Sequence, residues 1–93
     1  MKVAHASGSG TQALLPSGTY RLWNWGAHWT TGTRTGAARL FIFTATETLD
    51  SLNLAAEVAS NRIAGVLVHG IVTVGWKLTV THPINPYVVY TVP

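Results

Sequence analysis

Residues 72–80 read VTVGWKLTV, and this stretch alternates between two kinds of side chain. The even positions carry valine, tryptophan and leucine, whereas the odd positions carry threonine, glycine and lysine. A period of two places the large apolar side chains on one face of a β-strand, so one face is buried and the other tolerates solvent. Val66 and Val68 continue the same phase upstream. Because strands rarely exceed about ten residues, we expect a tight turn at His69–Gly70 rather than one very long strand.

Three further segments have the composition of β-strands. Residues 20–25 (YRLWNW) are rich in aromatic side chains and alternate with period two. Residues 38–46 (ARLFIFTAT) are apolar on both faces, which is typical of a central strand covered from both sides. Residues 87–92 form the last expected strand, after a loop at residues 82–86 that contains two prolines.

One segment has the period of a helix instead. Thr48 is a candidate N-cap, and Asp50 would lie in the first turn, where the helix dipole favours a negative charge. We therefore predict one short helix at about residues 48–61. The fold class is then mainly β, an antiparallel β-sandwich or small barrel of five or six strands with this one helix. The apolar residues that recur here at spacings of three and four are Leu49, Leu52, Ala56, Ala59 and Ile63.

The chain of 93 residues has the length of a single domain. Residues 1–13 include a polar Gly/Ser-rich stretch that buries too little apolar surface to order itself, so we expect a flexible N-terminal arm there and a single β-rich domain at residues 14–93. Residues 26–37 are expected to form a long Gly/Thr-rich loop, and such loops are usually functional or disordered. Neither a signal peptide nor a membrane span is expected, because no apolar stretch has the required length.

The chain has unusually few charges. Charged residues make up 10% of it, against about 25% in a typical domain. A charge-depleted surface is characteristic of the centre of a protein–protein interface, although a secreted or thermostable β-domain with a Thr-rich surface is the alternative. The only acids are Glu47, Asp50 and Glu57, on a chain of net charge +3. They predict either one acidic patch for head-to-tail contacts between copies or merely the solvated face of the helix.

Catalytic and metal chemistry have little support in the sequence. The absence of cysteine excludes disulfides, thiolate catalysis and Cys-based zinc sites. The three carboxylates lie in one segment with no opposing acid, and no serine occupies a G-x-S-x-G elbow. The four histidines lack metal-ligand spacing. We therefore predict a protein that is not an enzyme and that has no cofactor and no metal.

Residues 20–29 (YRLWNWGAHW) concentrate three of the four tryptophans and allow three interpretations: a core strand, a ligand platform, or a contact with another subunit. The alternation does not fix which face is buried. If Tyr20 and Leu22 point into the core, then Arg21, Trp23 and Trp25 point away from it. Another chain would then cover them. The candidate interface or ligand-contact residues are Arg21, Trp23, Trp25, His28, Trp29 and Arg34.

Two kinds of ligand can be weighed for these residues. Nucleic acid is not expected as a partner, because the six basic residues are spread thinly along the chain. A small carbohydrate-binding β-module is the alternative function, in which Trp23, Trp25 and Trp29 stack on sugar rings. A glycan is therefore the one small ligand that this segment predicts.

The chain has few charges, a Gly/Ser-rich arm and no cysteine, and these features are also found together in one class of small proteins. In general style, though in no specific motif, it resembles small virion structural proteins, the decoration (cement) or tail-component proteins of tailed bacteriophages. The resemblance implies a multicopy virion component that decorates or stabilises a capsid or tail. Its partners would be other copies of itself and a larger protein assembly, with no membrane involved.

Overall fold

The computed structural model describes residues 1–29, 38–54, 58–76 and 83–93. Within these ranges the chain forms strands and no helix, which confirms the mainly β fold class. The described residues therefore contain no helix that is long and apolar enough to cross a membrane. All the pairings between strands are antiparallel. The strands are β1 (Lys2–His5), β2 (Gly8–Ser9), β3 (Gln12–Trp29), β4 (Ala38–Phe43), β5 (Thr48–Leu54), β6 (Val58–Trp76) and β7 (Pro83–Thr91).

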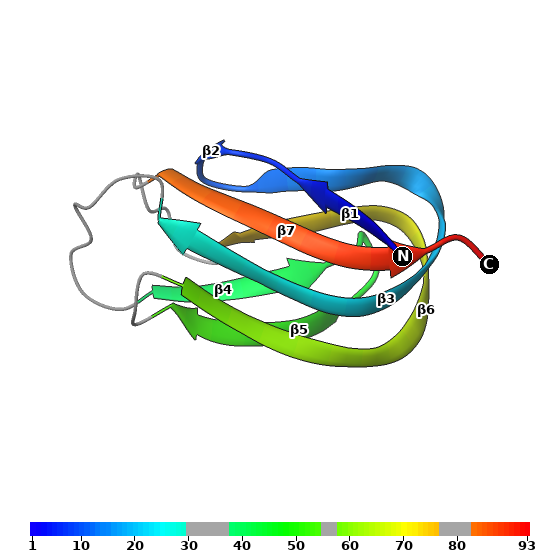
Figure 1. Cartoon of the computed structure of the whole chain (residues 1–93). Helices are drawn as coiled ribbons and strands as arrows, with labels where there is room; N and C mark the ends of the chain where they lie inside the picture. Colours follow the sequence, from blue (N-terminus) through cyan, green and yellow to red (C-terminus); the bar gives the residue numbers. More distant parts are fainter. Residues whose placement is uncertain (30–37, 55–57, 77–82) are drawn as a thin grey trace.

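The strands form one sheet that folds over on itself. Their order is β1-β7-β3-β6-β4-β5, and β2 also pairs with β7. The long strands β3 and β6 bend together, so each belongs to two layers (Figure 1). One layer, called here the β1–β7 layer, contains β1, β7, residues 21–29 of β3 and the first part of β6. The other, the β4–β5 layer, contains the first part of β3, the last part of β6, β4 and β5.

The core lies between these layers and, among the described residues, is built from aliphatic side chains together with Trp25 and Tyr20. In β6, Val72 and Val74 are fully buried and Thr73 between them is half-buried, which confirms the period of two at the start of residues 72–80. Residues 77–80 lie outside the described ranges. The other largest fully buried side chains are Leu22, Trp25, Leu40, Ile42, Leu54, Val68, Ile84, Pro86 and Val88.

The predicted helix at residues 48–61 is wrong. The described residues of this segment belong to β5 and to the start of β6. Leu52 and Leu54 are both buried and lie two positions apart, and Leu52 is directly opposite Leu40 of β4. The segment contains apolar residues at both helical and strand spacings. The spacing of apolar residues within the segment does not reveal its pairing with β4, and this pairing favours the strand.

The predicted turn at His69–Gly70 is also wrong, because β6 continues through both residues. His69 is opposite Thr19 and Gly70 is opposite Gly18, within the ladder that joins β3 to β6. The usual limit on strand length is exceeded because the strand bends and serves both layers. Gly65 lies at this bend with a φ of 66°, a conformation that residues with a side chain rarely adopt.

The N-terminal residues differ from the expected flexible arm. β1 pairs with residues 87–90 of β7, β2 pairs with residues 83–84, and residues 12–13 already belong to β3. Most β1 side chains are exposed, so backbone pairing rather than apolar burial holds this strand. The last strand begins at Pro83 and therefore includes both prolines of the expected loop. Pro83 is opposite Ser9 of β2, and Pro86 is opposite Ala27 of β3.

Candidate functional site

The side-chain pattern of β3 changes at Trp23. Leu22 is opposite Tyr90 of β7, and Asn24 is opposite the adjacent residue Val89. Two steps along β3 therefore match one step along β7, which makes Trp23 the extra residue of a β-bulge. A bulge shifts the alternation by one position, so residues after Trp23 point to the opposite face from the one that period two predicts.

Trp25 consequently lies in the core. Its exposed fraction is 0%, as is that of Leu22 three positions earlier. The indole Nε1 donates a hydrogen bond of 2.8 Å to Oδ2 of Asp50 on β5. The side-chain Nδ2 of Asn61 donates to the same oxygen at 3.2 Å and to the Ser51 carbonyl oxygen at 3.0 Å. The expectation that Trp25 points away from the core when Leu22 points into it is therefore wrong.

The same contacts bear on the expected acidic patch. Asp50 is half-buried on the β4–β5 layer and accepts two hydrogen bonds from the β1–β7 layer, so this carboxylate stabilises the fold. Glu47 is exposed, and Glu57 lies outside the described residues. Among the described residues, no three histidine, aspartate or glutamate side chains come together to hold a metal ion.

Arg21 and Trp23 are brought together at the bend of the sheet. Both side chains are half-buried. The Trp23 Nε1 donates to the Thr91 hydroxyl at 2.9 Å, and the Arg21 Nη1 donates to the Gly65 carbonyl oxygen at 2.9 Å. A Cβ at Gly65 would lie 2.8 Å from the Trp23 ring, so the indole packs directly over this glycine. Both side chains are thus fixed in place while part of their surface faces solvent.

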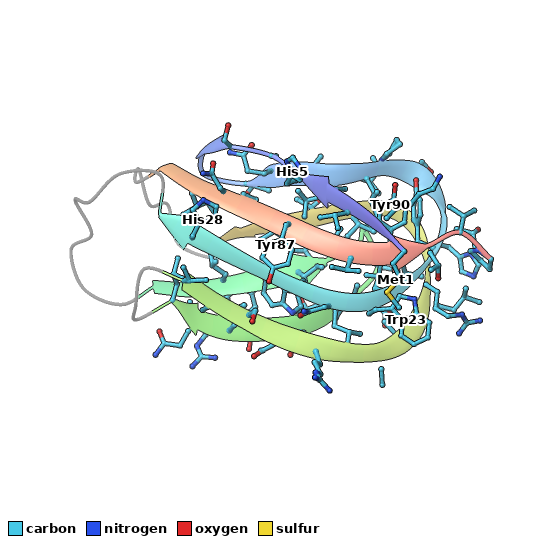
Figure 2. The ribbon with its side chains drawn as sticks, in the orientation of Figure 1. Met1, His5, Trp23, His28, Tyr87 and Tyr90 are labelled. Carbon is cyan, nitrogen blue, oxygen red and sulfur yellow. The ribbon has the colours of Figure 1, made fainter. Side chains whose placement is uncertain are left out.

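The remaining candidate residues do not join this pair. His28 is exposed near the end of β3, on the opposite side of the molecule from Trp23 in Figure 2. Trp29 is in β3, but its side chain is outside the described part, and Arg34 lies entirely outside the described residues. The six candidates therefore do not form one surface.

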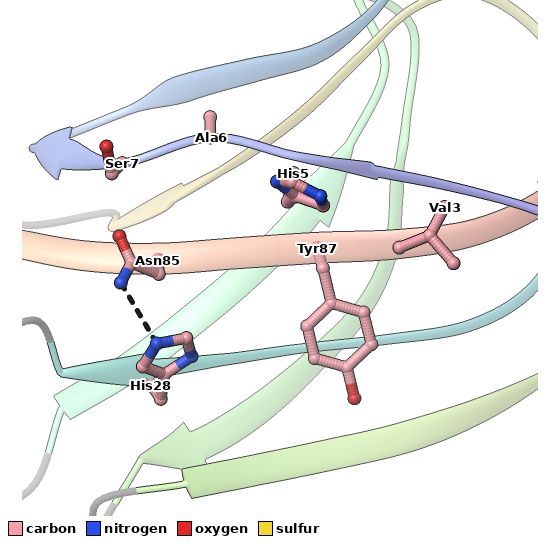
Figure 3. Close-up of a pocket in the computed structure, with 7 residues that line it drawn as sticks. All are labelled: Val3, His5, Ala6, Ser7, His28, Asn85 and Tyr87. Atoms are coloured by element: carbon pink, nitrogen blue, oxygen red, sulfur yellow. Dashed lines mark hydrogen bonds between the residues drawn. The ribbon is translucent and has the colours of Figure 1, made fainter.

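Two hollows of about 600 Å³ each lie along the outer face of the β1–β7 layer. The Trp23 groove, near the bend, brings Met1 beside Trp23 (Figure 2). The Tyr87 groove lies at the other end (Figure 3). The residues that line the Trp23 groove are Met1, Trp23, Asn24, Arg62, Ile63, Ala64 and Val89. Those that line the Tyr87 groove are Val3, His5, Ala6, Ser7, His28, Asn85 and Tyr87.

Of the Tyr87 groove, sequence reasoning identified only His28. The Tyr87 ring depends on Gly26, the residue directly opposite it on β3. A Cβ at Gly26 would lie 2.9 Å from the Tyr87 hydroxyl and would also contact the backbone oxygen of Ala59. The groove thus exists because glycine occupies this position.

Gly26→Ala is expected to lower the free energy of unfolding by about 1–3 kcal/mol, because the added methyl group overpacks against a backbone atom. Urea unfolding measures this loss, and the NMR signals of the Tyr87 ring should shift at the same time. Gly10→Ala serves as a control for destabilisation alone, since its φ of 76° strains an alanine although a Cβ there would meet nothing within 4 Å. Equal chemical-shift changes of Tyr87 in both variants would contradict the packing of its ring on Gly26.

No protein-family model, no curated protein and no solved structure matches this chain. The function is therefore argued from its own residues.

Proposed function

We propose that this protein is a non-enzymatic structural protein that assembles in multiple copies to decorate or stabilise a virion capsid or tail. The observation that carries the proposal is an aliphatic surface at the bend of the sheet. Val66, Leu67 and Val92 have exposed fractions of 37%, 42% and 60%, and we call them the bend patch. Leu67 on β6 and Thr91 on β7 are both directly opposite Arg21, and Val66 and Val92 are the residues next to them along the chain.

The bend patch has the composition of an interface centre. Aliphatic side chains leave water when a partner covers them, and this burial is the main favourable term in association. Arg21 lies in the same row with its guanidinium group already held by Gly65, so little freedom is lost when a partner contacts it. Arginine beside apolar residues is enriched at such centres, and charged residues are otherwise depleted there.

A second copy of this chain is the partner that this surface fits best. The low charge of the whole chain leaves little repulsion between copies. A surface that contacts itself about a two-fold axis needs no complementary patch elsewhere. Many such weak contacts on a capsid or tail would add together through multivalency, as the resemblance to phage decoration proteins implies.

Leu67→Asp tests this proposal. Placing a charge in the bend patch should weaken self-association by at least about tenfold, equivalent to about 1.4 kcal/mol. Sedimentation velocity over a concentration series measures the change. Val58→Asp is the matched control, because Val58 is 65% exposed on the same strand but lies in another part of the sheet. An equal effect of both variants, or no effect of either, would contradict the proposal.

The alternative function, a sugar-binding surface on Trp23, Trp25 and Trp29, cannot include Trp25. Trp25 is buried and its indole Nε1 is bonded to Asp50, so it offers no ring face to a ligand. Trp23 is half-exposed, but its Nε1 is bonded to Thr91. A platform of three stacked tryptophans is therefore not proposed.

A further inference from the structure

The Tyr87 groove presents an aromatic ring that lies across the sheet. Tyr87 is opposite His5 of β1 on one side and Gly26 of β3 on the other. Because Gly26 has no side chain, the ring extends over the β3 backbone, and Figure 3 shows it reaching from β7 across β3. The ring is half-buried. One ring face therefore packs on the strand, and the other is available to a ligand.

Polar groups flank this ring. In the next row, Asn85 is opposite His28, and their side chains share a hydrogen bond of 2.9 Å between Nδ2 and Nε2. The buried Asn85 Oδ1 has no hydrogen-bond partner among the described residues. In Figure 3 this oxygen points away from His28, on the side of Ser7. A buried acceptor without a donor costs stability, so the site favours a ligand that donates hydroxyl protons.

The lining of the groove also contains few side chains that can carry a charge. It contains no lysine, arginine, aspartate or glutamate, so the imidazoles of His5 and His28 are the only side chains of this lining that could form an ion pair with a charged ligand. In its neutral form the exposed ring of His5 adds one donor and one acceptor, whereas that of His28, whose Nε2 accepts from the Asn85 amide, adds one donor at Nδ1. The groove therefore combines a stacking surface with uncharged donors and acceptors.

We propose that the Tyr87 groove binds a neutral saccharide, a function separate from assembly through the bend patch. The apolar C–H face of a sugar ring would stack on Tyr87, as apolar ligand faces do on aromatic rings. Its hydroxyl groups would contact the Asn85 amide and the two histidines. These contacts require no tryptophan.

The test is a ¹H–¹⁵N NMR titration of the full chain with neutral disaccharides and trisaccharides of glucose, galactose, mannose and N-acetylglucosamine. At least one should produce saturable shifts at millimolar concentration, centred on residues 5, 28 and 85–87. Glucose 6-phosphate should produce weaker shifts, since the groove offers its charge no lysine or arginine. No saturable shift with any neutral sugar would overturn the proposal, and so would shifts centred on Trp23 instead.

Matched variants separate this site from the rest of the chain. Tyr87→Ala and His28→Ala should each weaken binding by at least about tenfold, whereas Tyr87→Phe should retain the stacking contact. His69→Ala is the control, because His69 is also exposed but lies outside the groove, bonded to Thr19. Unchanged binding by His28→Ala would overturn the assignment, even if Tyr87→Ala did not fold. Leu67→Asp should leave sugar binding intact, so the two functions can fail independently.

Discussion

Replacing Trp25 by alanine is expected to lower the free energy of unfolding by about 3–5 kcal/mol. The indole is fully buried between the two layers, and its removal leaves a cavity and takes away one of the two hydrogen bonds to Asp50 Oδ2. Equilibrium unfolding in urea, monitored by far-ultraviolet circular dichroism, measures the loss. A folded but destabilised variant is expected, and its self-association through the bend patch should be retained at low urea concentration.

Trp23→Ala is the matched comparison for this result. Trp23 is half-exposed and lies outside the core, so its removal should cost clearly less stability than that of Trp25. Regular alternation would have placed both indoles on the same face and given similar losses. A loss from Trp23→Ala equal to or greater than that from Trp25→Ala would show that the bulge at Trp23 is incorrectly placed.

Asp50→Ala is expected to cost about 1.5–3 kcal/mol, because a hydrogen bond to a charged group contributes that much and its loss leaves the buried Trp25 indole N–H unpaired. The donors to Asp50 are the indole of Trp25 and the side-chain amide of Asn61, which approach the same carboxylate oxygen from the opposite layer. Asp50→Asn should recover part of this stability, because its amide oxygen can still accept from Trp25. Urea unfolding of the three proteins gives the comparison.

Glu47→Ala removes the same charge without these contacts. Glu47 is exposed, so its substitution should change stability by less than about 0.5 kcal/mol. Equal losses in the Asp50 and Glu47 variants would show that net charge, rather than the hydrogen bonds between layers, accounts for the effect.

The local pattern was informative wherever a strand kept a regular register. Val72 and Val74 are buried as period two predicts, and residues 20–25 and 38–43 are strands. The pattern failed at Trp23 because a bulge is defined by the partner strand, and β7 lies more than 50 residues away. Arg21 and Trp23 are half-buried neighbours at the bend, and their role as contact residues stays a prediction, whereas the face of Trp25 could not be derived from alternation alone.

The helix at residues 48–61 failed for a related reason. Leu49 and Leu52 fit a helical spacing, while Leu52 and Leu54 fit a strand. Only the pairing of Leu52 with Leu40 on β4 distinguishes the two. A short segment with both spacings takes the structure that its tertiary contacts favour.

The Tyr87 groove was beyond sequence reasoning because its residues come from both ends of the chain. His5 fell in the expected flexible arm, and Asn85 fell in the expected loop between two prolines. The pairing of β1 with β7 brings them to one face. The close approach of Tyr87 to Gly26 had no signal in the sequence beyond the glycine itself.

The two proposed surfaces are compatible in one particle. The bend patch lies where β3 and β6 turn between layers, whereas His28 lies toward the opposite end of the β1–β7 layer (Figure 2). Asn85 is directly opposite His28 in the ladder. Copies that contact one another at the bend would leave the Tyr87 groove open. An assembled particle would then present many sugar sites, whose weak individual affinities add through multivalency.

Self-association through the bend patch is the central claim, and the mass of the full chain in solution tests it most directly. Light scattering should be recorded across a range of protein concentrations, at low and at high salt. We predict a mass that rises above the 10.0 kDa of one chain as concentration increases. High salt should not abolish this association, because the contact is apolar. A mass of 10.0 kDa at every concentration and salt level would contradict it.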